Sequence, residues 1–117
     1  MYQKVLIRGR AYIDPQLRYI ENGTPVVNYI LVINRKNNNN FADKIPVVAW
    51  GETAKNIDKH IKKGDMAFYE GELRSSEWQD EEGKTHYQIQ FQIDSFTKEF
   101  TKNNKKDEEP KGEEQNE

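Results

Sequence analysis

The sequence feature that most constrains the fold is a strict alternation of apolar and polar side chains over residues 86–93. Every second side chain in this segment is apolar: Tyr87, Ile89, Phe91 and Ile93 alternate with His86, Gln88, Gln90 and Gln92. A period of two places successive side chains on opposite faces of an extended chain. The segment is therefore predicted to be a strand with its apolar face in the core and its polar face in water.

Related patterns predict further strands over residues 2–13, 25–35, 44–51 and 65–74, with a short strand-like piece at 17–20. The dipeptide Asn22-Gly23 is a strong turn signal between that short piece and the 25–35 strand. Gly9 lies within the first strand and predicts a bulge or a sharp bend, as a small barrel needs at its corners. The polar run from Asn37 to Asn40 is predicted to be a flexible loop.

One helix is predicted between the third and fourth strands, over residues 52–61. Ala54, Ile57 and Ile61 fall on one helical stripe, and Gly64 provides a stop signal just after it. The order strand, strand, strand, helix, strand, strand is that of an OB-fold, an all-β, five-stranded Greek-key barrel. Such barrels bind oligonucleotides or oligosaccharides, but a fold alone does not give a function.

Length and composition indicate one domain over residues 1–100, followed by a tail at 101–117. The tail holds four basic and six acidic residues and, apart from proline, nothing apolar, so a disordered acidic tail is expected. The net charge is −2, and residues 1–100 sum to zero. Any nucleic-acid-binding face must therefore come from local clustering of cations.

Several classes of protein are disfavoured by the same composition. The chain has no cysteine, so disulfides, thiolate metal sites and a cysteine nucleophile are excluded. No apolar run reaches membrane-span length, and charges interrupt the N-terminal apolar run, so we expect neither a membrane segment nor a signal peptide. These observations favour a cytoplasmic protein. No nucleophile–base arrangement, phosphate-binding loop or metal-ligand spacing is present, so we expect no enzyme, no metal and no cofactor.

Six segments together resemble the bacterial and phage single-stranded DNA-binding proteins. They are VLIRGR at 5–10, DPQLRY at 14–19, NGTPVVNYIL at 22–31, VVAWG at 47–51, AKNIDKHIKKG at 54–64 and EGELRSSEW at 70–78. They follow the order and spacing of that family and cover residues 1 to about 100. The resemblance implies an OB barrel that coats and protects single-stranded DNA in replication, recombination and repair, usually as a homotetramer, with a homodimer as the alternative.

The resemblance also implies a set of binding residues. Trp50 and Trp78 occupy positions of stacking aromatics, and Arg18, Lys63 and Arg74 match basic positions near phosphate. Binding of single strands without sequence preference needs flat side chains that meet unstacked bases and a cationic groove that follows the backbone. The residues themselves add further candidates for these two roles: Arg10, Tyr19, Arg35, Lys36 and Lys44.

The chain departs from the family pattern at three places. Its Asn-rich run lies where a stacking aromatic is common, and Lys44 lies where another is common, so the stacking platform is reduced. The end of the chain lacks the family's acidic tip with its proline and hydrophobic residue, which puts docking of partner proteins through that tip in doubt. The alternative function is an OB module that binds RNA or a protein partner in a primosome, since the sequence does not reveal which sugar is recognised.

Overall fold

The computed structural model describes residues 1–100, apart from the side chains of Asn38 and Asn39, and the predicted tail at 101–117 lies outside the described residues. Its strands are β1 (Val5–Ala11), β2 (Gln16–Tyr19), β3 (Pro25–Arg35), β4 (Asn38–Trp50), β5 (Met66–Gln79) and β6 (Thr85–Glu99), and its helix is α1 (Gly51–His60). The prediction of an all-β fold with one short helix is confirmed.

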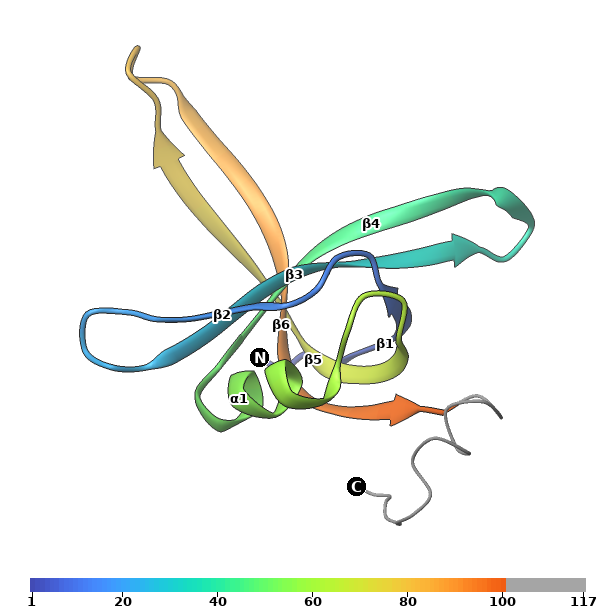
Figure 1. Cartoon of the computed structure of the whole chain (residues 1–117). Helices are drawn as coiled ribbons and strands as arrows, with labels where there is room; N and C mark the ends of the chain where they lie inside the picture. Colours follow the sequence, from blue (N-terminus) through green and yellow to red (C-terminus); the bar gives the residue numbers. More distant parts are fainter. Residues whose placement is uncertain (101–117) are drawn as a thin grey trace.

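Five of the strands close into a barrel in the order β1-β5-β6-β4-β3, and pairing of β1 with β3 completes the ring (Figure 1). All neighbours are antiparallel except β4 and β6, which run parallel at Val47 and Val48. The short β2 pairs only with β3 and extends that wall outside the ring. The predicted five-stranded OB barrel is confirmed, and the predicted helix follows its third long strand.

The core lies between the inward faces of these strands. Its largest fully buried side chains come from β3, β4, β5, β6, α1 and the residue after α1, and include Leu31, Val47, Tyr69, Phe91, Ile57 and Ile61. Fully burying one such side chain contributes about 1.5–3 kcal/mol. Helix α1 adds Ala54 and Ile57 to this cluster, and the Thr53 hydroxyl donates to the carbonyl of Asp94 on β6, so the helix is fixed against the barrel.

Glycines mark two places where strand backbones come close together. The register of β5 against β6 shifts between Glu70 and Gly71, and a Cβ on Gly71 would lie 2.0 Å from the carbonyl oxygen of Gln92. The bulge therefore lies at Gly71 and not at Gly9, where β1 stays in register with β5. Gly9 instead lies close to β3, just before β1 begins to pair with that strand.

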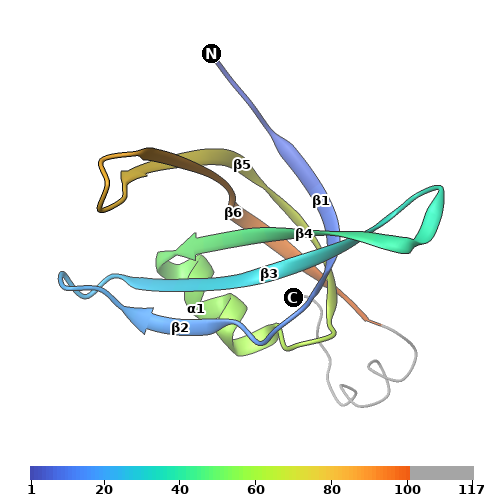
Figure 2. The same ribbon diagram turned by 90° about the horizontal axis from the view of Figure 1, so that it is seen from above.

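Two long hairpins extend beyond the barrel, β3–β4 and β5–β6, and they leave it in different directions (Figures 1 and 2). The prediction of a loop at Asn37 to Asn40 is wrong, because Arg35 pairs with Asn38 across a two-residue turn and β4 begins at Asn38. The strand predicted over 65–74 likewise continues to Gln79. The strands therefore continue further outside the core than the sequence pattern suggests.

The β5–β6 extension also overturns part of the predicted core. Tyr87 and Ile89 are 70% and 61% exposed, whereas Phe91 and Ile93 are buried as predicted. Tyr87 and Ile89 pair with Glu77 and Ser75, beyond the point where other strands flank the hairpin. Strict alternation identifies which residues share a face, but it does not tell where the barrel ends and the free arm begins.

Candidate nucleic-acid interface

One continuous outer face of the sheet carries both tryptophans. Directly opposite residues on paired strands share a face. Arg18 on β2 lies opposite Val26 on β3, which lies opposite Trp50 on β4, so these three form one row. Trp50 is the last residue of β4, immediately before the first turn of α1, and its side chain is 45% exposed. The β4-to-helix junction therefore presents an exposed indole, and Arg18 lies two strands away in the same row, across the buried Val26.

The same face continues onto the free arm of β5 and β6. Val48 on β4 is in register with Gln92 on β6, and Gln92 pairs with Glu72 on β5. Because side chains alternate along a strand, Arg74 and Trp78 lie on the same face as Glu72. Trp78 is 49% exposed and pairs with His86 near the end of the arm. The structure thus brings Arg18, Trp50, Arg74 and Trp78 onto one surface.

A second group of cations lies on the outer face at the end of β1. Arg10 pairs with Val32, and Val32 pairs with Lys44, so the two cations lie in one row across β1, β3 and β4. The Lys44 ammonium lies 4.6 Å from the centroid of the Tyr12 ring, and the Arg10 guanidinium donates to the carbonyl of Gly64. Lys63 lies next to that carbonyl, in the turn after α1.

The candidate arginines differ in whether a carboxylate already neutralises them. Arg74 pairs with Glu72 at 2.6 Å, and Arg35 pairs with Asp43 at 2.9 Å. The hydrogen bond between Arg35 and Asp43 raises the pKa of the arginine and lowers the pKa of the carboxyl group. Arg18 instead donates to the neutral Asn28 side chain. Exposed ion pairs are weak, so a phosphate can replace such a carboxylate, but the neutral environment of Arg18 makes it the better phosphate ligand.

Three predicted residues lie apart from these groups. Tyr19 alternates with Arg18 and points to the opposite face of the sheet, where its side chain is exposed. Arg35 and Lys36 lie at the tip of the β3–β4 hairpin, with Lys36 in its turn. Lys62, two residues after the end of α1, donates its ammonium to the carbonyl of Asp58 in the last turn of the helix, an interaction typical of a helix C-terminus.

Sequence reasoning missed two residues on the outer face. Tyr12 is exposed beneath Lys44, and the signal for it was an aromatic on the basic face of the first strand. His86 stacks on Trp78, with ring centroids 5.5 Å apart and ring planes at 23°. Its only sequence signal was its place in the alternating segment, because the contact depends on the register of β5 with β6.

Other kinds of site are not evident in residues 1–100. That part of the chain holds no cluster of three or more histidine, aspartate or glutamate side chains arranged for a metal ion. Its single helix is also too short and too polar to cross a bilayer. The outer face with its two indoles and unneutralised cations is therefore the best-defined site in the described residues.

The sequence is similar to those of known single-stranded DNA-binding proteins. The model of the single-strand binding protein family matches residues 2–108. The single-stranded DNA-binding protein of Oceanobacillus iheyensis is 34% identical over 99 residues, which are 81% of this chain and 62% of that protein. Single-stranded DNA-binding protein A of Bacillus subtilis is 32% identical over 99 residues, 81% of this chain and 58% of its own length.

A shorter relative is single-stranded DNA-binding protein 1 of Clostridium acetobutylicum, 36% identical over 89 residues, which are 72% of this chain and 81% of that protein. The chain thus spans about six tenths of the length of the first two relatives. The family match extends over most of the chain and includes both tryptophans and every candidate cation. This chain belongs to the single-strand binding protein family.

Proposed function

We propose that this chain binds single-stranded DNA without sequence preference, by stacking bases on Trp50 and Trp78 and by holding phosphates with cations of the same surface. The observation that carries the proposal is the continuous outer face that presents both indoles. Every base has a π-face, so stacking tolerates any sequence. Arg18 and Lys44 add positive charge that no carboxylate neutralises among the described residues.

The two contributions have different sizes and different responses to salt. Each base–aromatic contact is worth about 1–3 kcal/mol, so the two tryptophans together supply roughly 2–6 kcal/mol. Each phosphate contact adds about −0.7 to the slope of log affinity against log salt concentration for a single strand. We therefore expect binding that weakens steeply with salt, with a residual part at high salt that depends on the tryptophans.

The test is a titration with oligo(dT) of increasing length, followed by tryptophan emission and by anisotropy of labelled DNA. We expect quenching of emission, and weaker binding in Trp50→Ala and in Trp78→Ala. Tyr87→Ala is the matched control, because Tyr87 is an exposed aromatic on the opposite face of the same arm. Unchanged emission at low salt would remove the stacking proposal, and equal losses in all three variants would remove the assignment to this face.

The sugar is decided by a competition between oligo(dT) and oligo(U). We expect oligo(dT) to bind more tightly, and the proposed role is then to coat and protect single strands in replication, recombination and repair, in the compartment that holds the DNA. A preference for oligo(U) would favour the RNA-binding alternative, because the 2′-hydroxyl is the group that distinguishes the two sugars. Docking of repair and replication partners through the C-terminal tip is not part of the proposal.

We also propose that the chain acts as a homo-oligomer, in which one strand of DNA visits several equivalent faces and gains avidity. The support is the free edge of β1. Residues 6–9 pair with β5 on one side, and β3 joins on the other side only at Arg10 and Ala11. An unpaired strand edge is a template for another chain. A second copy that paired along this edge would satisfy its backbone groups.

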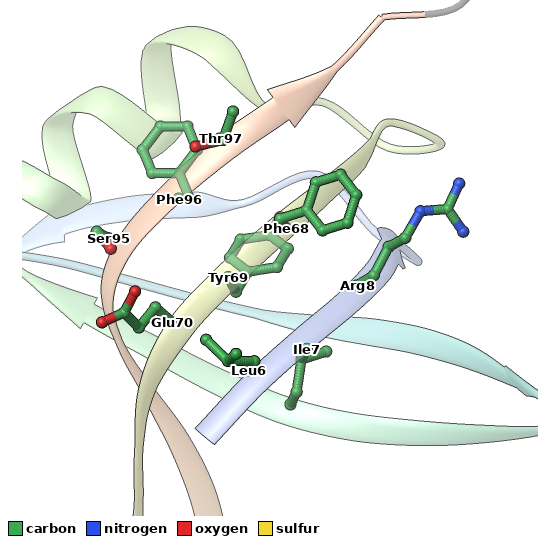
Figure 3. Close-up of a pocket in the computed structure, with 9 residues that line it drawn as sticks. All are labelled: Leu6, Ile7, Arg8, Phe68, Tyr69, Glu70, Ser95, Phe96 and Thr97. Carbon is green, nitrogen blue, oxygen red and sulfur yellow. The ribbon is translucent and has the colours of Figure 1, made fainter. Parts of the chain in front are cut away.

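The surface beside that edge is apolar and hollowed. An open cavity of about 310 Å³ lies over β1, β5 and β6, and its lining includes Leu6, Phe68 and Phe96 (Figure 3). Leu6 and Phe68 are both at least half exposed. Arg8 lies at one side of the cavity, where its guanidinium packs 5.7 Å from the Phe68 ring centroid and binds Glu99 with two hydrogen bonds.

Sedimentation velocity at micromolar concentration tests the oligomer. We expect a species of at least two chains, and we expect Leu6→Glu to dissociate it, because a carboxylate beside Phe68 would oppose burial. Ile89→Glu is the control, an exposed apolar residue on the arm. A monomeric parent protein would contradict the oligomer, and dissociation by Ile89→Glu alone would move the contact from the β1 edge to the arm.

A further inference from the structure

Three side chains at the end of the β5–β6 arm form a connected unit. Trp78 and His86 are a cross-strand pair with stacked rings, 5.5 Å between centroids and 23° between planes. The Nε2 atom of His86 lies 2.8 Å from Oδ2 of Asp80, so the imidazole is held from its far side. We name Trp78, His86 and Asp80 the arm triad. In this unit Asp80 in the turn contacts the imidazole of His86, and the imidazole stacks on the indole of Trp78.

Asp80 is itself fixed by the turn that closes the hairpin. Its Oδ1 accepts hydrogen bonds from the backbone amides of Glu82 and Lys84, both at 2.9 Å, and its own amide donates to the carbonyl of Lys84. The hydrogen bond from His86, followed by the one from the Lys84 amide, lowers the pKa of the Asp80 carboxyl group. Asp80 is therefore an ionised anchor whose second oxygen is directed at the imidazole.

The stack leaves Trp78 with one covered face and one open face. The imidazole covers part of one side of the indole, yet the residue remains 49% exposed. A nucleobase can therefore stack on the open side and make a three-layer arrangement of base, indole and imidazole. A supported ring loses less freedom on binding than an isolated one, because its orientation is already set.

We propose that His86 is a positioning residue for Trp78, and that protonation of His86 strengthens the stacking of DNA on the arm. This inference rests on the proposed function, since it concerns how one of the two stacking residues is held. Histidine is the side chain whose charge ordinarily changes between pH 5 and 8. A protonated imidazole gains an ion pair with Asp80, a cation–π contact with the indole, and attraction to phosphate.

The sign of the pH effect follows from the groups around His86. The same face carries Trp78 and Ser76 on β5 and Gln88 on β6, all neutral. The turn carries Asp80, Glu81, Glu82 and Lys84, of which Asp80 alone is in ion-pair contact with the imidazole. Protonation fixes the orientation of the indole before DNA binds and adds a positive charge that attracts phosphate, and both effects favour binding, so DNA binding at the arm tightens as the pH falls.

The primary experiment measures the affinity for labelled oligo(dT) by anisotropy between pH 5.5 and 8.5 at constant low salt. For the parent protein we expect binding to tighten about fivefold across this range, the equivalent of a modest part of one base stack. In His86→Phe the ring support stays but the titration is lost, so we expect a flat profile. In His86→Ala we expect a flat profile and an affinity about fivefold weaker than that of His86→Phe.

Two controls separate His86 from other causes. The chain has one other histidine, His60 on α1, and His60→Gln is expected to keep the parent profile. Thr85→Ala changes the neighbouring residue on β6, which points to the opposite face, and should also keep it. In Asp80→Asn the side-chain oxygen of residue 80 can still accept the backbone hydrogen bonds of the turn, but a protonated His86 no longer has a charged partner to hold it against Trp78, so the tightening with falling pH should be smaller.

A spectroscopic readout tests the contact without DNA. In a Trp50→Phe background Trp78 is the sole tryptophan, and a protonated imidazole stacked on it should quench its emission as the pH falls from 8 to 6. Adding His86→Phe should abolish this change. If the parent protein binds oligo(dT) but His86→Phe keeps both the pH profile and the emission change, the inference fails and the proposed function stands. If no variant binds oligo(dT) at any pH, the proposed function fails as well.

Discussion

The hydroxyl of Tyr29 on β3 donates a hydrogen bond to the hydroxyl of Tyr69 on β5, with 3.0 Å between the oxygens, inside the barrel. The two strands do not pair with each other, so the bond joins separate walls of the core. The rings are 6.5 Å apart at 59°, and both residues are almost fully buried. Each buried hydroxyl therefore has the other as its hydrogen-bond partner, at a place where neither is in contact with water.

This pair predicts non-additive effects on stability. Tyr29→Phe or Tyr69→Phe alone leaves one buried hydroxyl without its partner, at a cost of about 1–2 kcal/mol in the free energy of unfolding. The double variant removes both polar groups and should cost about 1 kcal/mol less than the sum of the single variants. Urea denaturation measures all three, with Tyr12→Phe, an exposed tyrosine, as the control. Additive losses would show that the bond contributes nothing.

The same pair predicts loss of stability at alkaline pH. Burial raises the pKa of Tyr69 to about 12, and it also raises the pKa of Tyr29. Above the unfolded value near 10, the unfolded chain releases a phenol proton that the folded chain keeps, so the free energy of unfolding falls as pH rises. For Tyr69 the loss is about 2–3 kcal/mol between pH 10 and 12. Denaturation midpoints across this range should fall less steeply in Tyr69→Phe than in the parent protein.

The barrel could be predicted from the sequence because its signals are local. Alternation in β1 and β6, the apolar run of β3 and the stripe of Ala54 and Ile57 each depend on a few neighbouring residues, and their order identifies the OB topology. The glycine signal was less specific, because the sequence placed a bulge or sharp bend at Gly9, whereas the register shift lies at Gly71. The loop predicted at Asn37 to Asn40 and the strand end predicted at residue 74 were wrong, because the length of a strand beyond the core has no local signal.

The remainder of the site could not be predicted because it depends on pairing between distant segments. That Arg18, Trp50 and Trp78 share a face follows from the registers of four strand pairs, which no local pattern reveals. Neutralisation of Arg74 by Glu72 also requires the structure, because alternate residues of a strand share a face but their side chains need not meet. The core prediction has the same limit. Tyr87 and Ile89 were expected to be buried but are exposed, because their burial depends on where the other strands of the barrel end.

The ion pair between Arg74 and Glu72 predicts that removing one negative charge tightens DNA binding. In Glu72→Gln the arginine no longer has a competing carboxylate, so affinity for oligo(dT) should rise about two- to threefold at low salt, a surface ion pair being worth under about 1 kcal/mol. The log–log salt slope should steepen by up to about 0.7. Glu52→Gln, on α1 beside Lys55, is the control. Unchanged binding in Glu72→Gln would place Arg74 outside the DNA contact.

Gly71 predicts a large, position-specific loss of stability. A Cβ at this residue would lie 2.0 Å from the Gln92 carbonyl oxygen, which belongs to the backbone of β6 and cannot turn aside. Gly71→Ala should therefore cost about 3 kcal/mol or more, whereas Gly9→Ala, with its nearest atom at 3.3 Å, should cost about 1 kcal/mol. Thermal unfolding compares the two. Similar melting temperatures would mean that the β5–β6 bulge can adjust without cost.

Residues 101–117 lie outside the described structure, and their composition predicts an effect on binding but not on folding. Residues 1–100 form a closed barrel with its own buried core, so the truncated chain should keep the melting temperature of the full one. The segment has two more acidic than basic residues and competes with phosphate for the cations of the outer face. Truncation should therefore tighten oligo(dT) binding about twofold at low salt, and the gain should vanish as added salt screens the charges.

A full-length variant with the six acidic residues replaced by Asn and Gln should match the truncated protein. Weaker binding by the truncated chain would show instead that this segment assists DNA binding.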